Sequence, residues 1–491
     1  MITETPMDLS ELLAVVTGAQ VELGPGARSL IQAGRAIVDS ALAGEEPVYG
    51  LNTGVGHMKD QRVGREELGR FQEWLLETHE GGLGEPLPSA SVRAAMVTLL
   101  NKFARGGSGV SLAVAETIAA MLNAGVRPVL SQTGSVGAAD LGQMAQIGLV
   151  LIGRGSAEID GDVVTGREAL SRAGIPEPRL QARDGLALIS TNGVSIGEAA
   201  ILLERGGALA RRAEGVVALS LESIRGNPSI VHPAVGRAKP FPGLIASCDA
   251  IREALVGGDL VEDPASPRSV QDPLSFRVAP QVHGAFRDAV TGAEHTVGVE
   301  LNARSDNPLV AIEDGVLVHN GNFHPIHMAL AMDGLRLAAV HVGQLSERRM
   351  DHLWNAYFQD VAPLGNPRAE GAARVAYGAA LRYSGAATYA ELRQLAAPAT
   401  LDVPPLDMGI EDHATGAPLA VRITAAAFDL LDDLLAIEIL LARDVLETLP
   451  VRPVLGVGAR SVLEQVDEMV SGSPDSTSAS QIHRMLIGSW R

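Results

Sequence analysis

The chain has 491 residues, of which 46% are hydrophobic and 20% charged, so it can bury a large core and is not mainly disordered. Its 58 acidic residues outnumber its 39 basic residues, and no run of Lys or Arg offers the basic patch of a nucleic-acid-binding protein. The single cysteine, Cys248, excludes a disulfide framework within the chain. The sequence has neither a signal-peptide pattern nor an apolar run of about 18 residues, so we expect a cytoplasmic protein that contacts no membrane.

Helical patterns dominate the chain. Helical spacing and composition predict helices over 65–79, 91–103, 111–122, 196–224, 325–350 and 417–449. Two short strand patterns turn at Asp160-Gly161 and Asp314-Gly315, which predicts small β-hairpins over 158–164 and 310–318. The predicted fold is therefore mainly α with minor hairpins.

The long helices predict a bundle. The first half of the 325–350 helix is apolar nearly all round, which is typical of a helix buried among others. We divide the chain into an N-terminal part (1–200) with the active-site loops, a central helical bundle (201–350) and a C-terminal helical part (351–491) that completes it.

Two familiar site motifs find little support. Gly54-Val55-Gly56 lacks the third glycine of a dinucleotide-binding loop and follows no convincing strand. His324 and His327 lie three residues apart near a helix start and could share a metal ion, but no cysteine or carboxylate cluster accompanies them. We expect hydrogen-bonded polar residues there and no metal, with a metal-dependent enzyme as the alternative.

Polar, mostly glycine-flanked segments between the apolar helices carry the functional signal. They lie at 48–56, 78–82, 133–141, 192–193, 271–277 and 411–413. Each alone favours a turn or a helix cap. Together with Glu300–Leu309 and Gly321–His324, they closely resemble the histidine/phenylalanine ammonia-lyase family over about residues 14 to 449. The resemblance implies a long central bundle of the ammonia-lyase/fumarase-like type, carbon–nitrogen lyase activity, and a homotetramer whose active sites are shared between subunits.

The resemblance also implies roles in a 1,2-elimination from a small-molecule substrate. Tyr49 matches the base that removes the β-proton, and Glu411 is a second candidate for acid–base chemistry. A tyrosine base needs a lowered pKa, so we expect positive charge or hydrogen-bond donors beside it. Arg277 matches the residue that grips the substrate carboxylate through its planar fork.

Further matches concern substrate binding. Asn192 and Gln271 match residues that position the substrate, and Phe323 matches a pocket wall. His79 and Glu411 match positions that contact the imidazole or the reacting centre in histidine-specific members. These two polar residues favour an imidazole-like ring, because a phenyl ring would leave them unpaired.

Two positions depart from the family pattern. Members typically carry an Ala-Ser-Gly triplet that cyclises into an electrophilic methylidene-imidazolone group, but this chain reads Ala138-Ala139-Asp140, with no serine and one residue fewer. Leu274 stands where the family usually has a tyrosine that supports the electrophile. We therefore expect no methylidene-imidazolone and no other cofactor.

The absence of the electrophile narrows the range of leaving groups that the enzyme can release. The electrophile bonds the substrate amine and makes it a better leaving group, whereas a trimethylammonium group has no lone pair to bond and already leaves well. We expect trimethylamine release from a histidine betaine, ergothioneine or hercynine, a reading that resembles the ergothionase branch of the family. Carboxylates such as Glu411, or an aromatic wall, would hold the trimethylammonium.

Two alternatives stay open. One is a methylidene-imidazolone-dependent histidine ammonia-lyase, giving urocanate and ammonia, with a modified residue in the loop. Restoring Ala-Ser-Gly at either alanine leaves one alanine too many, and Leu274 unexplained. The other is a catalytically inactive member with a structural or regulatory role. Retention of five reacting-site residues argues against that role; these are Tyr49, Asn192, Gln271, Arg277 and Glu411.

Overall fold

A computed structural model describes residues 2–44, 46–263, 267, 269–360, 376–449, 451–474 and 477–490. The chain forms two compact units, each assembled from three stretches. Unit 1 comprises Met1–Leu203, Ala293–Met332 and Pro398–Arg422, and unit 2 comprises Glu204–Gly292, Asp333–Ala397 and Ile423–Arg491. Four of the five boundaries between the units fall within the long helices α9 (Gly193–Ser223), α14 (Ala279–Leu301), α15 (Ile326–Asp360) and α18 (Ala417–Thr448), and the fifth lies between Ala397 and Pro398, after the end of α17 (Tyr377–Gln394).

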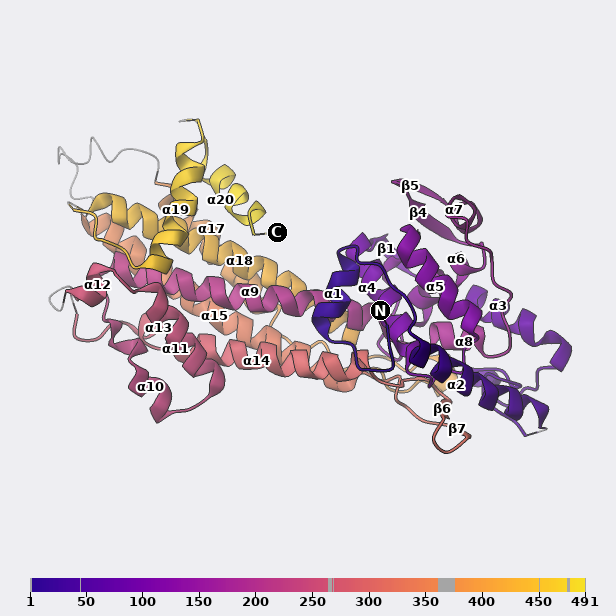
Figure 1. The fold of residues 1–491 in the computed structure, drawn as a ribbon. Coiled ribbons are helices and arrows are strands. Elements are labelled where there is room, and N and C mark those ends of the chain that lie inside the picture. The colour runs from indigo at the N-terminus through magenta and orange to yellow at the C-terminus, as the bar shows by residue number, and fades with distance from the viewer. Residues whose placement is uncertain are drawn as a thin grey trace. The chain divides into compact units, whose positions relative to one another are not determined.

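Unit 1 packs short helices around α4 (Figure 1). Every residue of α4 from Ala94 to Ala104 is buried, and α1, α2 and α5 all pack against it. Local signals set the helix ends: Asp8 and Glu11 form a capping box at α1, and Gly125, with a φ of 71°, ends α5. The helices that lie wholly within unit 1 are α1 (Leu9–Val16), α2 (Pro25–Ala43), η1 (Gly56–Met58), η2 (Arg65–Glu67), α3 (Leu68–His79), α4 (Ser89–Ala104), α5 (Leu112–Ala124), α6 (Leu141–Leu151), α7 (Gly166–Arg172), α8 (Asp184–Ile189) and η4 (Asp407–Gly409).

The strands of unit 1 form small antiparallel sheets. β1 (Leu83–Pro86) pairs with β3 (Ser131–Thr133), and β6 (Leu309–Ala311) pairs with β7 (Val316–Val318). β4 (Ser156–Ile159) lies between β2 (Arg127–Pro128) and β5 (Asp162–Thr165). The β4–β5 turn has positive φ at both Asp160 and Gly161, as a two-residue type I′ turn requires.

Unit 2 is held by buried polar pairs between long helices, which run alongside one another in Figure 1. Glu438 of α18 accepts from Ser220 of α9 and from Arg349 of α15. Glu214 of α9 pairs with Arg287 of α14. The remaining helices are η3 (Pro228–Val231), α10 (Pro233–Ala238), α11 (Pro242–Ala254), α12 (Asp259–Glu262), α13 (Leu274–Arg277), α17 (Tyr377–Gln394), α19 (Val457–Ser471) and α20 (Ala479–Gly488).

The mainly helical prediction is confirmed, and so are both predicted hairpins and the six predicted helices. The structure extends the 325–350 helix to Asp360. The division at residues 200 and 350 stays a prediction. Among the described residues, one helical stretch, Asp184–Ser223, is apolar and long enough to cross a membrane, but 89% of its most apolar window is buried inside the protein. That burial is typical of a core helix.

Candidate active site

The loop that carries Tyr49 is folded back on itself. Asn52 N–H donates to the carbonyl of Val48, and the Asn52 side chain accepts from Val48 N–H over 2.7 Å. The loop returns so that Gly56 N–H donates to the Tyr49 hydroxyl oxygen over 2.9 Å. The Tyr49 ring is partly buried and meets the His319 ring edge to face. The hydroxyl oxygen therefore has a fixed hydrogen-bond donor.

Opposing charges surround Tyr49. Burial raises the pKa of the Tyr49 phenol, and the carboxylates of Glu411 and Asp407 raise it further. Gly56 N–H and the buried guanidinium of Arg183 lower this pKa, but burial prevails. The expected donor and positive charge are both present, whereas the expected net lowering of the pKa is wrong for the free chain. A base role for Tyr49 therefore requires additional positive charge when substrate is bound.

Glu411 and Asp407 lie on the same tight turn. Leu406 and Glu411 pair in an antiparallel bridge, with Leu406 N–H donating to Glu411 O over 2.8 Å. Between them, Asp407, Met408 and Gly409 have φ values of 46°, 55° and 84°, a run of left-handed residues. Burial, and then the charge of Asp407, raise the pKa of the Glu411 carboxyl. A raised pKa suits a group that exchanges protons near neutral pH.

The loop at 138–140 does not fit a methylidene-imidazolone group. Ala138 and Ala139 are 7% and 4% exposed and contribute methyl groups alone. The Asp140 carboxylate is fully buried and accepts from Ser135 Oγ over 2.8 Å, from Ser195 Oγ over 2.9 Å and from Ser195 N–H over 2.8 Å. Burial raises the pKa of Asp140, and these hydrogen bonds oppose that rise. The loop thus supplies no serine to cyclise, and its carboxylate is already bonded.

The backbone of Phe323 connects this loop to Asn192. The Phe323 carbonyl accepts from Ala139 N–H over 3.2 Å and from Asn192 Nδ2 over 2.7 Å. Asn192 is 1% exposed, yet its Oδ1 has no hydrogen-bond partner among the described residues. An unpaired buried acceptor costs about 1–3 kcal/mol. Among the described residues, this oxygen therefore lacks the partner that a buried acceptor requires.

His79 lies at the end of α3. Its Nδ1 is 2.8 Å from the carbonyl oxygen of Leu75, so Nδ1–H donates and Nε2 is left as an acceptor. The His79 carbonyl lies beside Gly142 in α6, the helix that follows the 138–140 loop. No described contact joins the His79 side chain to Tyr49, so its role toward an imidazole ring stays a prediction.

Gln271 and Arg277 belong to unit 2, whereas the other predicted site residues belong to unit 1. Arg277 ends α13, and the carbonyl of Ser275 in that helix accepts from Arg349 Nη1 over 3.1 Å. Arg349 in turn forms a fully buried ion pair with Glu438. The helix that carries the predicted carboxylate clamp is therefore anchored to the core of its own unit.

His324, one of the two histidines that could share a metal ion, lies against the ring of His413. His324 Nε2 lies 3.0 Å from His413 Nδ1, and the ring centroids are 4.9 Å apart. Burial lowers the pKa of His324, and so does the charge of His413. Within the described part of the chain, no group of three or more His, Cys, Asp or Glu side chains is arranged to hold a metal ion. His324 is therefore a hydrogen-bonded histidine with His413 as its partner.

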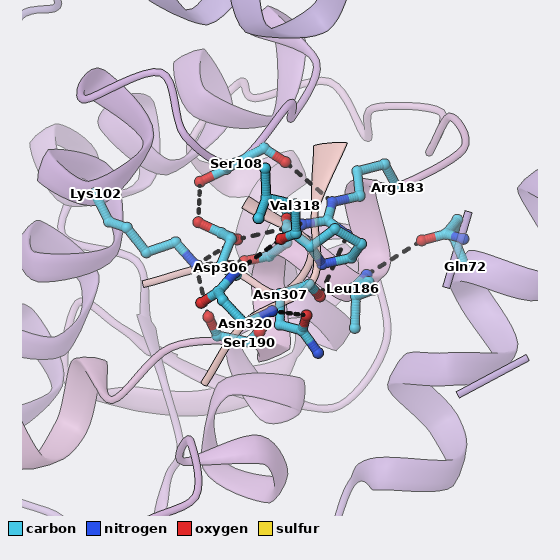
Figure 2. Close-up of polar contacts among 12 residues, drawn as sticks. Gln72, Lys102, Ser108, Arg183, Leu186, Ser190, Asp306, Asn307, Val318 and Asn320 are labelled. Atoms are coloured by element: carbon cyan, nitrogen blue, oxygen red, sulfur yellow. Dashed lines mark hydrogen bonds and ion pairs between the residues drawn. The ribbon is translucent and has the colours of Figure 1, made fainter. Parts of the chain in front are cut away.

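A buried network of charged and polar side chains is centred on Asp306, as Figure 2 shows. Lys102, Ser108 and Arg183 converge on Asp306, with Lys102 Nζ 3.0 Å and Ser108 Oγ 2.8 Å from its carboxylate oxygens. Lys102 also donates to the carbonyl of Ser190, next to the segment that carries Asn192. The network holds that segment in place. It also positions Arg183, whose positive charge lowers the pKa of Tyr49.

Sequence reasoning did not identify several of these residues. Lys102 carried a usable signal, because a lysine in a mostly apolar helical segment needs a polar partner if it is buried. Asp306 lies inside the segment 300–309, which carries part of the family resemblance. His57 and Asp407 carried no signal, because their contact joins residues 350 positions apart.

A helical fold that positions a loop tyrosine beside carboxylates, with the polar segments identified above, defines a carbon–nitrogen lyase of the ammonia-lyase type. The chain belongs to the aromatic amino acid lyase family, whose sequence model matches residues 7–468.

Similar proteins fall into two groups. The chain is 36% identical over 441 residues to a histidine ammonia-lyase of Gloeobacter violaceus, covering 89% of this chain and 85% of that protein. It is 34% identical over 489 residues to a histidine ammonia-lyase of Myxococcus xanthus, covering 99% and 94%. Among solved structures it matches ergothionase from Treponema denticola, in complex with desmethyl-ergothioneine sulfonic acid, with a TM-score of 0.92 and 26% identity, covering 99% of this chain and 98% of that one.

Proposed function

We propose that this protein releases trimethylamine from a betaine of histidine, ergothioneine or hercynine, without a methylidene-imidazolone group. The observation that carries the proposal is the 138–140 loop, where two buried alanines and a fully bonded Asp140 stand in place of a cyclising triplet. Leu274 lacks the hydroxyl of the tyrosine that usually accompanies the electrophile. The likeness to ergothionase in fold supports the same substrate class.

The substrate's leaving group makes the electrophile unnecessary. A primary amine leaves poorly and gains from covalent activation, whereas a quaternary ammonium departs as neutral trimethylamine. The base removes a β-proton, the C–H electron pair forms the α,β double bond, and the bond from the α-carbon to nitrogen breaks. The product is an unsaturated acid conjugated with the ring.

The charges near Tyr49 suit a cationic substrate. Glu411 and Asp407 raise the pKa of the phenol in the free chain, and a trimethylammonium beside them would offset their negative charge. Substrate binding would thereby lower the pKa of Tyr49 and supply the positive charge that the base needs. Glu411, with its own raised pKa, would accept from the imidazole ring or take part in the proton transfer.

Arg277 would bind the substrate carboxylate, and Gln271 would help to position the substrate. Asn192 Oδ1 would accept a hydrogen bond from a donor on the substrate. His79 Nε2 and the wall at Phe323 would contact the ring. We further propose a homotetramer in which Tyr49 and Arg277 of one active site come from different subunits, as the resemblance to the ammonia-lyase family implies.

The second candidate is a histidine ammonia-lyase that produces urocanate and ammonia. The identity of about one third to proteins of that name over nearly the whole chain favours it. It requires an electrophile that the sequence Ala138-Ala139-Asp140 does not supply.

Purified protein incubated with ergothioneine tests the proposal, with Tyr49→Phe as the control. The expected products are trimethylamine and thiourocanic acid, identified by mass spectrometry, and the control should form neither. The tryptic peptide that contains residues 135–141 should keep its unmodified mass, whereas cyclisation would remove two waters. Absence of turnover on ergothioneine and hercynine would contradict the proposal. If histidine is not turned over either, the result would favour a catalytically inactive member of the family.

A further inference from the structure

The loop of Tyr49 and the turn of Glu411 are joined by one side chain. Asp407 Oδ2 accepts from His57 N–H over 2.9 Å, and Asp407 Oδ1 lies 2.5 Å from His57 Nδ1. A carboxylate oxygen accepts but does not donate, so the imidazole carries its proton on Nδ1. The neighbouring Gly56 N–H is the group that donates to the Tyr49 hydroxyl. Asp407 therefore fixes the peptide next to the donor of the base.

The fit between the two segments leaves no room for a side chain at position 56. A Cβ on Gly56 would lie 2.0 Å from Asp407 Oδ2, and Gly56 has a φ of 56°. Asp407 itself has a left-handed backbone, with a φ of 46°, which Asp tolerates better than most residues. The contact of Asp407 with Gly56 and His57 thus combines close packing, two interactions of one carboxylate and two unusual backbone conformations.

We propose that Asp407, with His57, is a positioning residue of the elimination: it locks the Gly56 N–H onto the Tyr49 hydroxyl and holds the Glu411 turn against the Tyr49 loop. The inference deepens the proposed function and rests on it for the identity of the reaction. It assigns no contact with substrate to Asp407.

The same carboxylate acts on Tyr49 through its charge. The groups that face the phenol are Asp407 and Glu411 from the turn, Arg183 from the segment before α8, Gly56 N–H from its own loop, and the His319 ring. Of these, the two carboxylates raise the pKa of Tyr49, whereas Arg183 and Gly56 lower it. Loss of the Asp407 charge with retention of its contacts should therefore make the phenol more acidic.

Two variants of Asp407 separate the contacts from the charge. Asp407→Asn keeps an acceptor for His57 N–H and offers an N–H₂ to His57 Nδ1, so the geometry survives and the charge is lost. Asp407→Ala removes both. Asp412→Asn is the matched control, because it removes a negative charge from the same segment at an exposed position. Protein labelled with 3-fluorotyrosine allows the Tyr49 phenol to be titrated by ¹⁹F NMR, with its signal assigned by its loss in Tyr49→Phe.

The expected result is a Tyr49 titration, and an acid limb of kcat, that both move to lower pH in Asp407→Asn. In Asp407→Ala we expect kcat to fall at least about tenfold with KM changed less than about threefold. Asp412→Asn should move neither. A Tyr49 titration unchanged in both Asp407 variants, in folded protein, would overturn the inference. Because the titration needs no substrate, it still decides the inference if no betaine is turned over, a result that would sink the proposed function alone.

Discussion

Ala139 occupies a backbone conformation that an alanine adopts at a cost. Its φ is 61°, and the left-handed region costs a residue with a Cβ about 1–2 kcal/mol relative to glycine. We predict that Ala139→Gly raises the stability of the protein by up to about 1 kcal/mol, because relief of this strain exceeds the added flexibility of the unfolded chain. Thermal unfolding monitored by circular dichroism measures the change, and a lower Tm than wild type would contradict the backbone conformation described for this loop.

Asp140 contributes to the site by holding the loop in place. Its carboxylate accepts hydrogen bonds from Ser135 and from Ser195 in the first turn of α9. Asp140→Ala leaves these donors without a partner, so we predict a loss of about 2–4 kcal/mol and a large fall in activity. Thermal unfolding and kcat are the measurements. Asp162→Ala, at an exposed β-strand position in the same unit, is the control. Equal stability of the two variants would show that Asp140 has no such role.

At the scale of elements, the buried network on Asp306 should dominate the stability of unit 1. Lys102 and Arg183 are fully buried cations that face this carboxylate. Asp306→Ala leaves both without their counter-charge, and loss of one partner of a buried ion pair costs about 3–5 kcal/mol. We predict that Asp306→Ala lowers the Tm by several degrees, whereas Asp314→Ala, on the exposed turn of the β6–β7 hairpin, leaves it within about 1 °C. Comparable Tm values would refute the role of the network.

The elements were largely predictable from sequence, and the site was predictable in part. The helices over 196–224 and 417–449 were predictable because the spacing of their apolar residues is helical over a long stretch. The turn at Asp160-Gly161 was predictable because these two residue types tolerate the backbone angles of a tight hairpin turn. The contact of His57 with Asp407 was not predictable, because it depends on two loops folding toward each other. We expected the pKa of Tyr49 to be lowered, whereas burial of the phenol raises it. The sequence did not reveal this, because the residue types alone do not show how deeply a side chain is buried.

Unit boundaries were the least predictable feature, for a physical reason. Four of the five fall inside α9, α14, α15 and α18, where the helical pattern continues without a break, and the fifth falls between Ala397 and Pro398. A linker is recognised by a change in composition, and at the four boundaries inside helices there is no such change to recognise.

At the scale of the whole molecule, His283 should make stability depend on pH. It is fully buried with both ring nitrogens unpartnered among the described residues, and burial, with Arg349 and Arg287, holds its pKa well below the ordinary value. The unfolded state then binds the proton more tightly, so stability falls as the pH drops below about 6.5, by about 1.4 kcal/mol per pH unit. We predict that the Tm of His283→Leu declines less than that of wild type between pH 7.5 and pH 5.5. Parallel declines would contradict the prediction.

Sharing of active sites between subunits has a direct genetic test. Tyr49→Phe and Arg277→Met should each be inactive. If one site takes these residues from different subunits, co-expression of the two variants restores wild-type pairs in about one quarter of the sites under random assembly. Activity near that level in the mixed oligomer supports sharing. No restoration, in mixed oligomers verified by affinity tags, would place both residues of a site on one chain.

The central claim is elimination of a quaternary amine without an electrophilic prosthetic group. The most direct test is the rate of hercynine turnover against that of histidine, because the two substrates differ in the three methyl groups on nitrogen alone. The intact mass of the same preparation should be recorded. We predict turnover of hercynine to urocanate and trimethylamine, no ammonia from histidine, and the mass of the unmodified chain. Turnover of histidine by protein that has lost two waters would contradict the account.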